Sequence, residues 1–206
     1  MKQFLALVLI GFSLSLCNLS ERFKKGSAAS GPSGAKTSDV TAEHGQPTAA
    51  QTAALAGGQQ IKWDRQGMSW TVPPKWTEQS NESKEFIWRS PGGGDAANLI
   101  VSISPMDESF PTEASIQAFY DGAKTRAKNG EVDELKWVEI DGLKGVQFRE
   151  ANPEKPDGIR RLQWLAYRKY TGQVQMINLM LATQGKDFDR HKDEMYGILY
   201  STKITH

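Results

Sequence analysis

Hydrophobic residues divide the chain into three parts. Residues 4–16 form one uncharged apolar run near the N-terminus, and residues 18–58 contain few large apolar side chains. From residue 59 to residue 206, short apolar segments alternate with polar turns. This alternation has the two-residue period of half-buried strands, interrupted twice by the longer period of amphipathic helices. The pattern predicts a signal segment at 1–17, a tether at 18–58 and a folded domain at 59–206.

The folded part predicts an antiparallel sheet of about six to seven strands covered by helices, an α+β fold. Residues 112–129 and 187–200 place apolar side chains on one face at helical spacing. Asp141 and Gly142 form a dipeptide that is a strong signal for a two-residue hairpin. Residues 173–183 are apolar on both faces, which is typical of a central strand covered on both sides.

The order of motifs in this domain carries a family resemblance. Residues 72–76 (Val-Pro-Pro-Lys-Trp) are followed by a hairpin with an Asn-led strand at 98–101, a long helix, the 138–145 hairpin and two long paired strands. This order resembles PsbP-like domains over residues 61–205. The family includes photosystem II subunits and assembly factors, a Ran-binding transport factor and many bacterial envelope lipoproteins. The resemblance implies an α/β/α sandwich and a non-catalytic role, without shared functional residues.

The apolar run at 4–16 predicts export. It spans 13 residues, whereas a helix that crosses a bilayer needs about 20, so a signal peptide fits better than a stable span. Cys17, the chain's one cysteine, follows directly, and Leu14-Ser15-Leu16-Cys17 resembles the lipobox of bacterial lipoproteins. That resemblance implies lipidation of Cys17 and a membrane anchor. Leu16 departs from the pattern, in which Gly, Ala or Ser is usual.

Two alternatives to lipidation use the same residues. Simple cleavage after Cys17 would release a secreted soluble protein, and an uncleaved run would act as a short signal anchor, favoured by the basic residues that follow. In the lipidated reading, the Gly-, Ala-, Ser- and Thr-rich segment 18–58 is a flexible tether. The domain at 59–206 is then held at the bacterial cell envelope, facing the periplasm or the exterior.

Charge argues against nucleic acid as a partner. The formal net charge is +1, and residues 59–206 carry 20 Lys and Arg against 21 Asp and Glu. Phosphate binding needs a basic excess on one face, because neutralisation of phosphates supplies most of the affinity. Nucleic acid is therefore not expected as a partner.

Few side chains offer catalytic or metal chemistry. Of the three histidines, His44 lies in the predicted tether, His206 ends the chain and His191 lies in a charged stretch of the last helix, where we expect it to be solvated. No paired-histidine spacing and no calcium-loop spacing occurs. The sequence therefore predicts no metal, no cofactor and no enzymatic activity.

Binding residues are the remaining candidates, because exposed tryptophans and basic clusters are typical of partner surfaces. The candidates are two of the six tryptophans and a basic group at the ends of one strand: Trp76, Trp137, Arg160, Arg161, Arg168 and Lys169. The first hypothesis is a membrane-tethered, envelope-facing module for protein binding or assembly. The alternative is a lipoprotein that binds a small ligand or glycan through exposed tryptophans. An unrecognised hydrolase is the third hypothesis.

Overall fold

The computed structural model describes residues 41–205, and all structural statements below concern this part of the chain. Its elements, in chain order, are β1 (Glu43–His44), α2 (Ala49–Ala54), β2 (Gln59–Trp63), η2 (Asp64–Gln66), β3 (Met68–Val72), β4 (Thr77–Asn81), β5 (Glu85–Arg89), β6 (Asn98–Met106), α3 (Thr112–Lys128), β7 (Val132–Ile140), β8 (Leu143–Glu150), β9 (Ile159–Tyr170), β10 (Gln173–Gln184), η3 (Gly185–Asp187), α4 (Phe188–Tyr200) and β11 (Lys203–Ile204).

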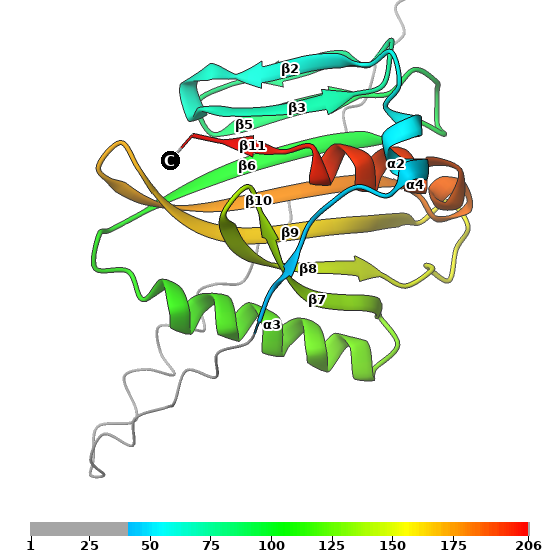
Figure 1. Cartoon of the computed structure of the whole chain (residues 1–206). Coiled ribbons are helices and arrows are strands. Elements are labelled where there is room, and N and C mark those ends of the chain that lie inside the picture. The colour runs from blue at the N-terminus through cyan, green and yellow to red at the C-terminus, as the bar shows by residue number, and fades with distance from the viewer. Residues whose placement is uncertain (1–40, 206) are drawn as a thin grey trace, which may run out of the picture. The chain divides into compact units, whose positions relative to one another are not determined.

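The main sheet has eight strands in the order β1-β7-β8-β9-β10-β6-β5-β4, and a second sheet has three in the order β11-β3-β2. Neighbouring strands are antiparallel except β1, which lies parallel to β7. The turn between β7 and β8 places Asp141 at φ 49° and Gly142 at φ 81°, the left-handed pair that such a hairpin requires. Figure 1 shows the small sheet and α4 on one side of the main sheet.

The inner face of the main sheet, which faces α4 and the small sheet, carries the larger core. Alternate residues on its strands are fully buried there, as are the apolar residues of α4. Phe86 stacks on Trp63 and Trp70 of the small sheet, with ring centroids 5.5 Å and 5.2 Å apart. These aromatic contacts join the two sheets, because large rings bury more apolar area than any other side chain.

The outer face carries a smaller core under α3. This helix packs against β7, β8 and β9, and Ile116 and Ala123 on its inward stripe contact a cluster that includes Trp137 and Val146. The predicted α+β fold class is confirmed. The main sheet has eight strands where six or seven were expected, because β1 lies in the segment assigned to the tether and the polar strand β4 has no apolar alternation.

Residues 43–58, which we call the arm, show that the predicted domain boundary at residue 59 is wrong. The composition placed them in the tether, but β1 pairs with β7 and α2 packs against α4. Leu55 reaches the larger core, and a side chain at Gly197 of α4 would clash with the Gln51 carbonyl oxygen at 2.8 Å. Leu55 and the pairing of β1 with β7 dock this arm, and Gly197 lets the backbones of α2 and α4 approach closely. The remainder of the predicted tether, 18–40, lies outside the described residues.

Candidate functional site: the uncovered part of the sheet

Strand β10 differs between its two faces. Ile177, Leu179 and Leu181 point to the inner face and are fully buried, whereas Met176 and Met180 on the outer face are only half-buried. The sequence predicted cover on both sides, and on the outer face this expectation fails at Met180, whereas Val174 is 3% exposed and Met176 packs against the cluster under α3. A helix is about 10 Å across and strands lie about 4.8 Å apart, so one helix covers two or three strands.

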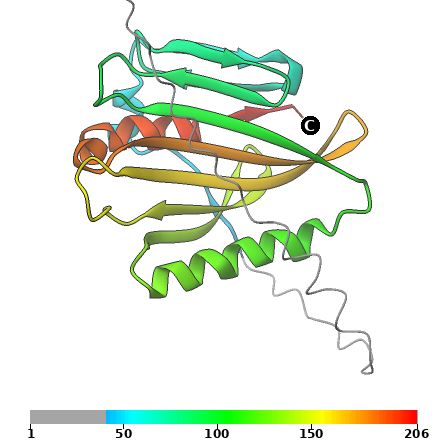
Figure 2. The same ribbon diagram turned by 180° about the vertical axis from the view of Figure 1, so that it is seen from behind.

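The outer face therefore has an uncovered part. Since α3 packs against β7, β8 and β9 and α4 packs on the inner side, no described helix covers β6, β5 and the part of β10 around Met180, among the orange and green strands of Figure 2. We call a group of outer-face residues of these strands, with two neighbours from β9, the open face: Glu85, Ile87, Arg89, Asn98, Ile100, Ser102, Asn178, Met180, Gln163 and Arg161.

Strand register puts the aliphatic residues of the open face in one row. Ile87 lies opposite Ile100, and Ile100 lies opposite Met180. Gln163 continues the row on β9 and donates a hydrogen bond from Nε2 to Oδ1 of Asn178 at 2.8 Å. Directly opposed side chains on one face are in contact, so the row forms a continuous apolar strip across three strands.

Two polar rows flank this strip. On one side, Arg89, Asn98 and Arg161 lie at matching register positions, and on the other Ser102 lies opposite Asn178. Nη2 of Arg89 donates to the carbonyl oxygen of Gly93 at 2.6 Å, its one recorded hydrogen bond. An apolar centre with a polar rim is the usual anatomy of a protein–protein interface.

The two candidate tryptophans are not on the surface. Trp76 is 3% exposed in the larger core, and Trp137 is 7% exposed under α3, where its ring stacks on Tyr120 at 5.1 Å. Both predictions of surface contact are wrong. Trp137 occupies an outer-face position of β7, and the sequence did not show that α3 would cover that strand.

Two of the four basic candidates are also buried. Arg160 is 5% exposed and Arg168 is 6% exposed, so their prediction as partner contacts is wrong. The Arg160 guanidinium lies 4.2 Å from the ring centroid of Phe188, and Arg168 donates to Gln66 and Gln175. Burial lowers the pKa of Arg168. These two residues alternate in phase with buried Trp164, so the two-residue period contained the signal for their burial.

The other two basic candidates have the opposite phase. Arg161 and Lys169 point to the outer face, where Arg161 borders the open face and Lys169 is exposed. Arg161 is paired with Glu150, with 3.0 Å between Nη1 and Oε2. The basic group of the sequence is thus split between the two faces of β9.

Predicted residue Cys17 lies outside the described residues, so its lipidation stays a prediction. Between residues 41 and 205, no helix is both long and apolar enough to cross a membrane. In the same residues, no group of His, Cys, Asp and Glu side chains is arranged to hold a metal ion.

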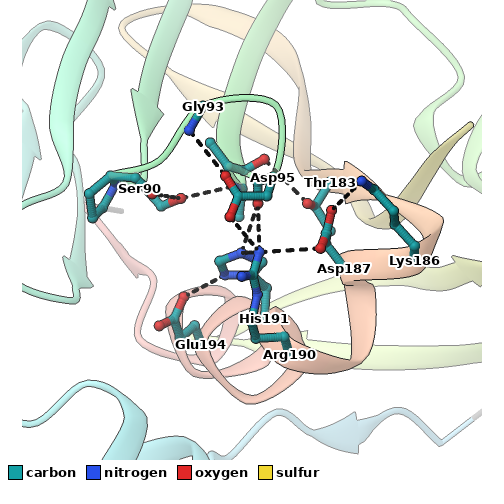
Figure 3. A network of polar contacts seen from close by, with 12 residues as sticks. Ser90, Gly93, Asp95, Thr183, Lys186, Asp187, Arg190, His191 and Glu194 are labelled. Atoms are coloured by element: carbon teal, nitrogen blue, oxygen red, sulfur yellow. Dashed lines mark hydrogen bonds and ion pairs between the residues drawn. The ribbon is translucent and has the colours of Figure 1, made fainter. Parts of the chain in front are cut away.

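His191 lies in a polar network between α4 and the loop that joins β5 to β6 (Figure 3). It is 9% exposed, so the expectation of a solvated histidine is wrong. Its Nδ1 lies 3.0 Å from Oε2 of Glu194 and its Nε2 lies 3.0 Å from the carbonyl oxygen of Asp95. The hydroxyl of Ser90, a residue of the same network, is not bonded to this ring; it accepts a hydrogen bond from the Ala97 backbone amide. The ring is therefore not positioned to activate this hydroxyl, as a nucleophilic site requires.

Two polar cavities open elsewhere on the domain. One, of about 420 Å³, lies beside β3 and β11, and the other, of about 340 Å³, lies between the arm, β7 and α4. In the second, the Tyr196 hydroxyl donates to Glu134 at 2.7 Å and accepts from Arg149 at 3.1 Å. Burial raises the pKa of Tyr196. These polar groups already bind one another, which leaves few of them to bind a ligand.

Comparison with known proteins identifies the fold. No family model and no curated protein matches the chain. The crystal structure of LpqN, involved in cell envelope biogenesis of Mycobacterium tuberculosis, matches with a TM-score of 0.52 at 14% identity, over 81% of this chain and 90% of LpqN. The cyanobacterial PsbP of Synechocystis sp. matches with a TM-score of 0.46 at 15% identity, over 72% and 92%. The Ran-binding protein Mog1p of Saccharomyces cerevisiae gives 0.37 at 8%, over 71% and 95%.

LpqN, the match with a TM-score above 0.5, is a fold of the PsbP/Mog type, so the chain has the fold that its motifs predicted. At such low identities the likeness shows the fold alone. Function has to be argued from the surface of this chain.

Proposed function

We propose that this protein is a non-catalytic module of the bacterial cell envelope that docks another protein on its open face. The observation that carries the proposal is β10, whose inner side is fully buried while Met180 on its outer side has no helix over it. An apolar strip that no described element covers is a typical protein-binding surface.

The partner that fits is a protein with an apolar ridge and carboxylates along one side. Ile87, Ile100 and Met180 would receive the ridge. Arg89 would meet a carboxylate, because its one recorded hydrogen bond goes to a backbone carbonyl oxygen. Complementary charge at the rim of an interface fixes orientation and speeds association.

The envelope location rests on the N-terminus and on one structural likeness. The apolar run followed by Cys17 predicts export and a lipid anchor. LpqN, whose fold this chain shares, is involved in cell envelope biogenesis. Both support a domain that faces the periplasm or the exterior.

The competing hypotheses have less support. A glycan-binding role required exposed tryptophans, but Trp76 and Trp137 are buried. A hydrolase required a base free to activate a nucleophile, but both ring nitrogens of His191 contact oxygens of the domain itself.

A photo-crosslinking amino acid at Ile100 in the full-length protein, expressed in its own cells, tests the docking surface. We expect one partner to crosslink at Ile100 and not at Lys124, an exposed residue of α3 away from the open face. Introducing Met180→Lys beside the crosslinker should abolish the product while circular dichroism stays unchanged. Equal labelling at both sites, or a product that Met180→Lys leaves intact, would overturn the proposal.

The anchor is tested separately. Cys17→Ser should remove palmitate labelling and release the protein from the membrane fraction, because the acyl chains have no other attachment point in a chain with one cysteine. Unchanged membrane association would contradict lipidation and favour an uncleaved signal anchor. This result would leave the docking test unaffected.

A further inference from the structure

The loop between β5 and β6 is held against α4 at one place. It contains the run Gly92-Gly93-Gly94, where a side chain at Gly93 would meet no atom within 4 Å. Asp95 Oδ1 accepts the Gly93 backbone amide at 3.0 Å. Beyond this internal turn, the contacts to α4 come from two consecutive helix residues, Arg190 and His191, as Figure 3 shows. A glycine-rich loop has little stiffness of its own, so these contacts hold its position together with the bonds from Arg89 to Gly93 and from Thr183 to Ala96.

The His191 ring lies between two oxygen acceptors. Nδ1 faces the Glu194 carboxylate and Nε2 faces the Asp95 carbonyl oxygen, each at 3.0 Å. A neutral imidazole has one N–H donor, whereas the protonated ring has two. Only the protonated ring can therefore donate to both oxygens at once.

Arg190 offers the neutral ring a different hydrogen bond. Its Nη2 lies 3.3 Å from Nε2 of His191 and 3.2 Å from the same Asp95 carbonyl oxygen. When Nε2 loses its proton, it can accept a hydrogen bond from Arg190 and no longer donates to the loop. The proton on Nε2 thus decides whether His191 bonds to the loop or to its own helix.

We propose that His191 is a proton-operated latch, which tightens the hold of α4 on the β5–β6 loop in mildly acidic surroundings and loosens it as the pH rises, while the Arg190–Asp95 ion pair persists. The latch bears on the open face, because the loop leaves β5 at Arg89 and enters β6 at Asn98, and Arg89 is bonded to Gly93. A domain outside the cytoplasm is exposed to the ambient pH. The latch rests on geometry alone, and its effect on partner docking rests on the proposed function.

The charges around the ring support this direction. Glu194 and Arg190 face it from α4, and Asp95 faces it from the loop; Asp187 reaches it only through Arg190. Thr183, the β10 residue at this contact, is neutral and donates to Ala96. The pKa of His191 is raised, first by the hydrogen bond to Glu194 and also by the Asp95 carbonyl oxygen, against burial and the Arg190 charge.

The sign of the pH effect follows from this raised pKa. A histidine whose pKa is higher in the folded state contributes stability that is complete below its unfolded value, near 6.5. That contribution is lost as the pH rises through the folded-state pKa. The Arg190 hydrogen bond lowers the pKa of Asp95, so the carboxylate stays ionised over this range.

Hydrogen exchange of the full-length protein tests the latch. After correction for intrinsic exchange, protection of residues 91–97 should fall about threefold or more between pH 6 and pH 8. His191→Gln should remove this dependence, since glutamine does not titrate, whereas His44→Gln should retain it. His44 is a matched control because it also faces a carboxylate, that of Glu139.

A second variant keeps His191 in place. Glu194→Gln removes the carboxylate that holds the proton, so the loss of protection and the ring titration seen by NMR should both move to lower pH. Identical pH dependence in wild type and His191→Gln, no change in Glu194→Gln, or a wild-type ring that titrates at or below about 6.5 would overturn the proposal. None of these measurements needs the partner, so they are independent of the docking test.

Discussion

The outer face of the main sheet has two halves that follow the same alternation but differ in their cover. Under α3, Trp137, Val146 and Phe148 are at most 7% exposed. On β10 and β6, Met180 and Ile100 are half-buried beside polar Ser102. Residues 41–205 provide one helix for this face and place α4 on the other. Burial on a sheet is therefore set by the helices available as well as by the strand pattern.

The two halves also differ in the types of side chain that the sequence places on them. The covered half contains the large rings of Trp137 and Phe148, which fill the space beneath a helix. The open half mixes aliphatic residues with small polar ones, which limits the cost of leaving it in water. The two halves thus differ in the side chains they carry as well as in their cover.

The largest expected effect concerns the covered half. Trp137→Ala should lower the free energy of unfolding by about 3–5 kcal/mol, because it leaves a cavity under α3 and removes the stacking on Tyr120. Urea denaturation followed by circular dichroism measures it. A loss below about 1 kcal/mol would show that α3 does not seal this half and would break the comparison.

The two sides of β10 give a sharper test within one strand. Leu179→Ala should cost about 2–5 kcal/mol, because Leu179 is 0% exposed. Met180→Ala, its neighbour on the open face, should cost about 1 kcal/mol or less. The same urea titration applies to both variants. Equal losses would mean that something covers Met180 in solution.

The smallest expected effect tests whether the open face has space for additional side-chain atoms. Ser102→Val should change stability by about 0.5 kcal/mol or less, since added methyl groups extend into solvent there. Ala123→Leu under α3, where the alanine is 5% exposed, should cost about 1–3 kcal/mol through overpacking. Thermal unfolding of both variants measures the two losses of stability. If Ser102→Val costs as much as Ala123→Leu, the two halves do not differ in the space above them.

The fold was largely predictable because it depends on local pattern. The helix expected at 112–129 is α3, and the hairpin around Asp141 and Gly142 forms at the expected residues. The arm was not predictable from composition. Its docking depends on Leu55 meeting a space left by Gly197, about 140 residues later in the chain.

The candidate site was predicted poorly for a related reason. Of the six proposed contact residues, Trp76, Trp137, Arg160 and Arg168 are buried. For the two arginines, the alternation with Trp164 already indicated the inner face. For the tryptophans no such signal existed, because their exposure depends on which element packs over them.

The sequence by itself determined most of the strands, the two long helices and which side chains share a face, since these follow from backbone geometry and spacing along the chain. It also determined the apolar run that ends at Cys17. Only the tertiary structure decided which half of the outer face α3 covers, and that His191 of α4 meets Asp95 of a distant loop. Contacts between segments far apart in the chain depend on how whole elements pack, and no local pattern encodes them.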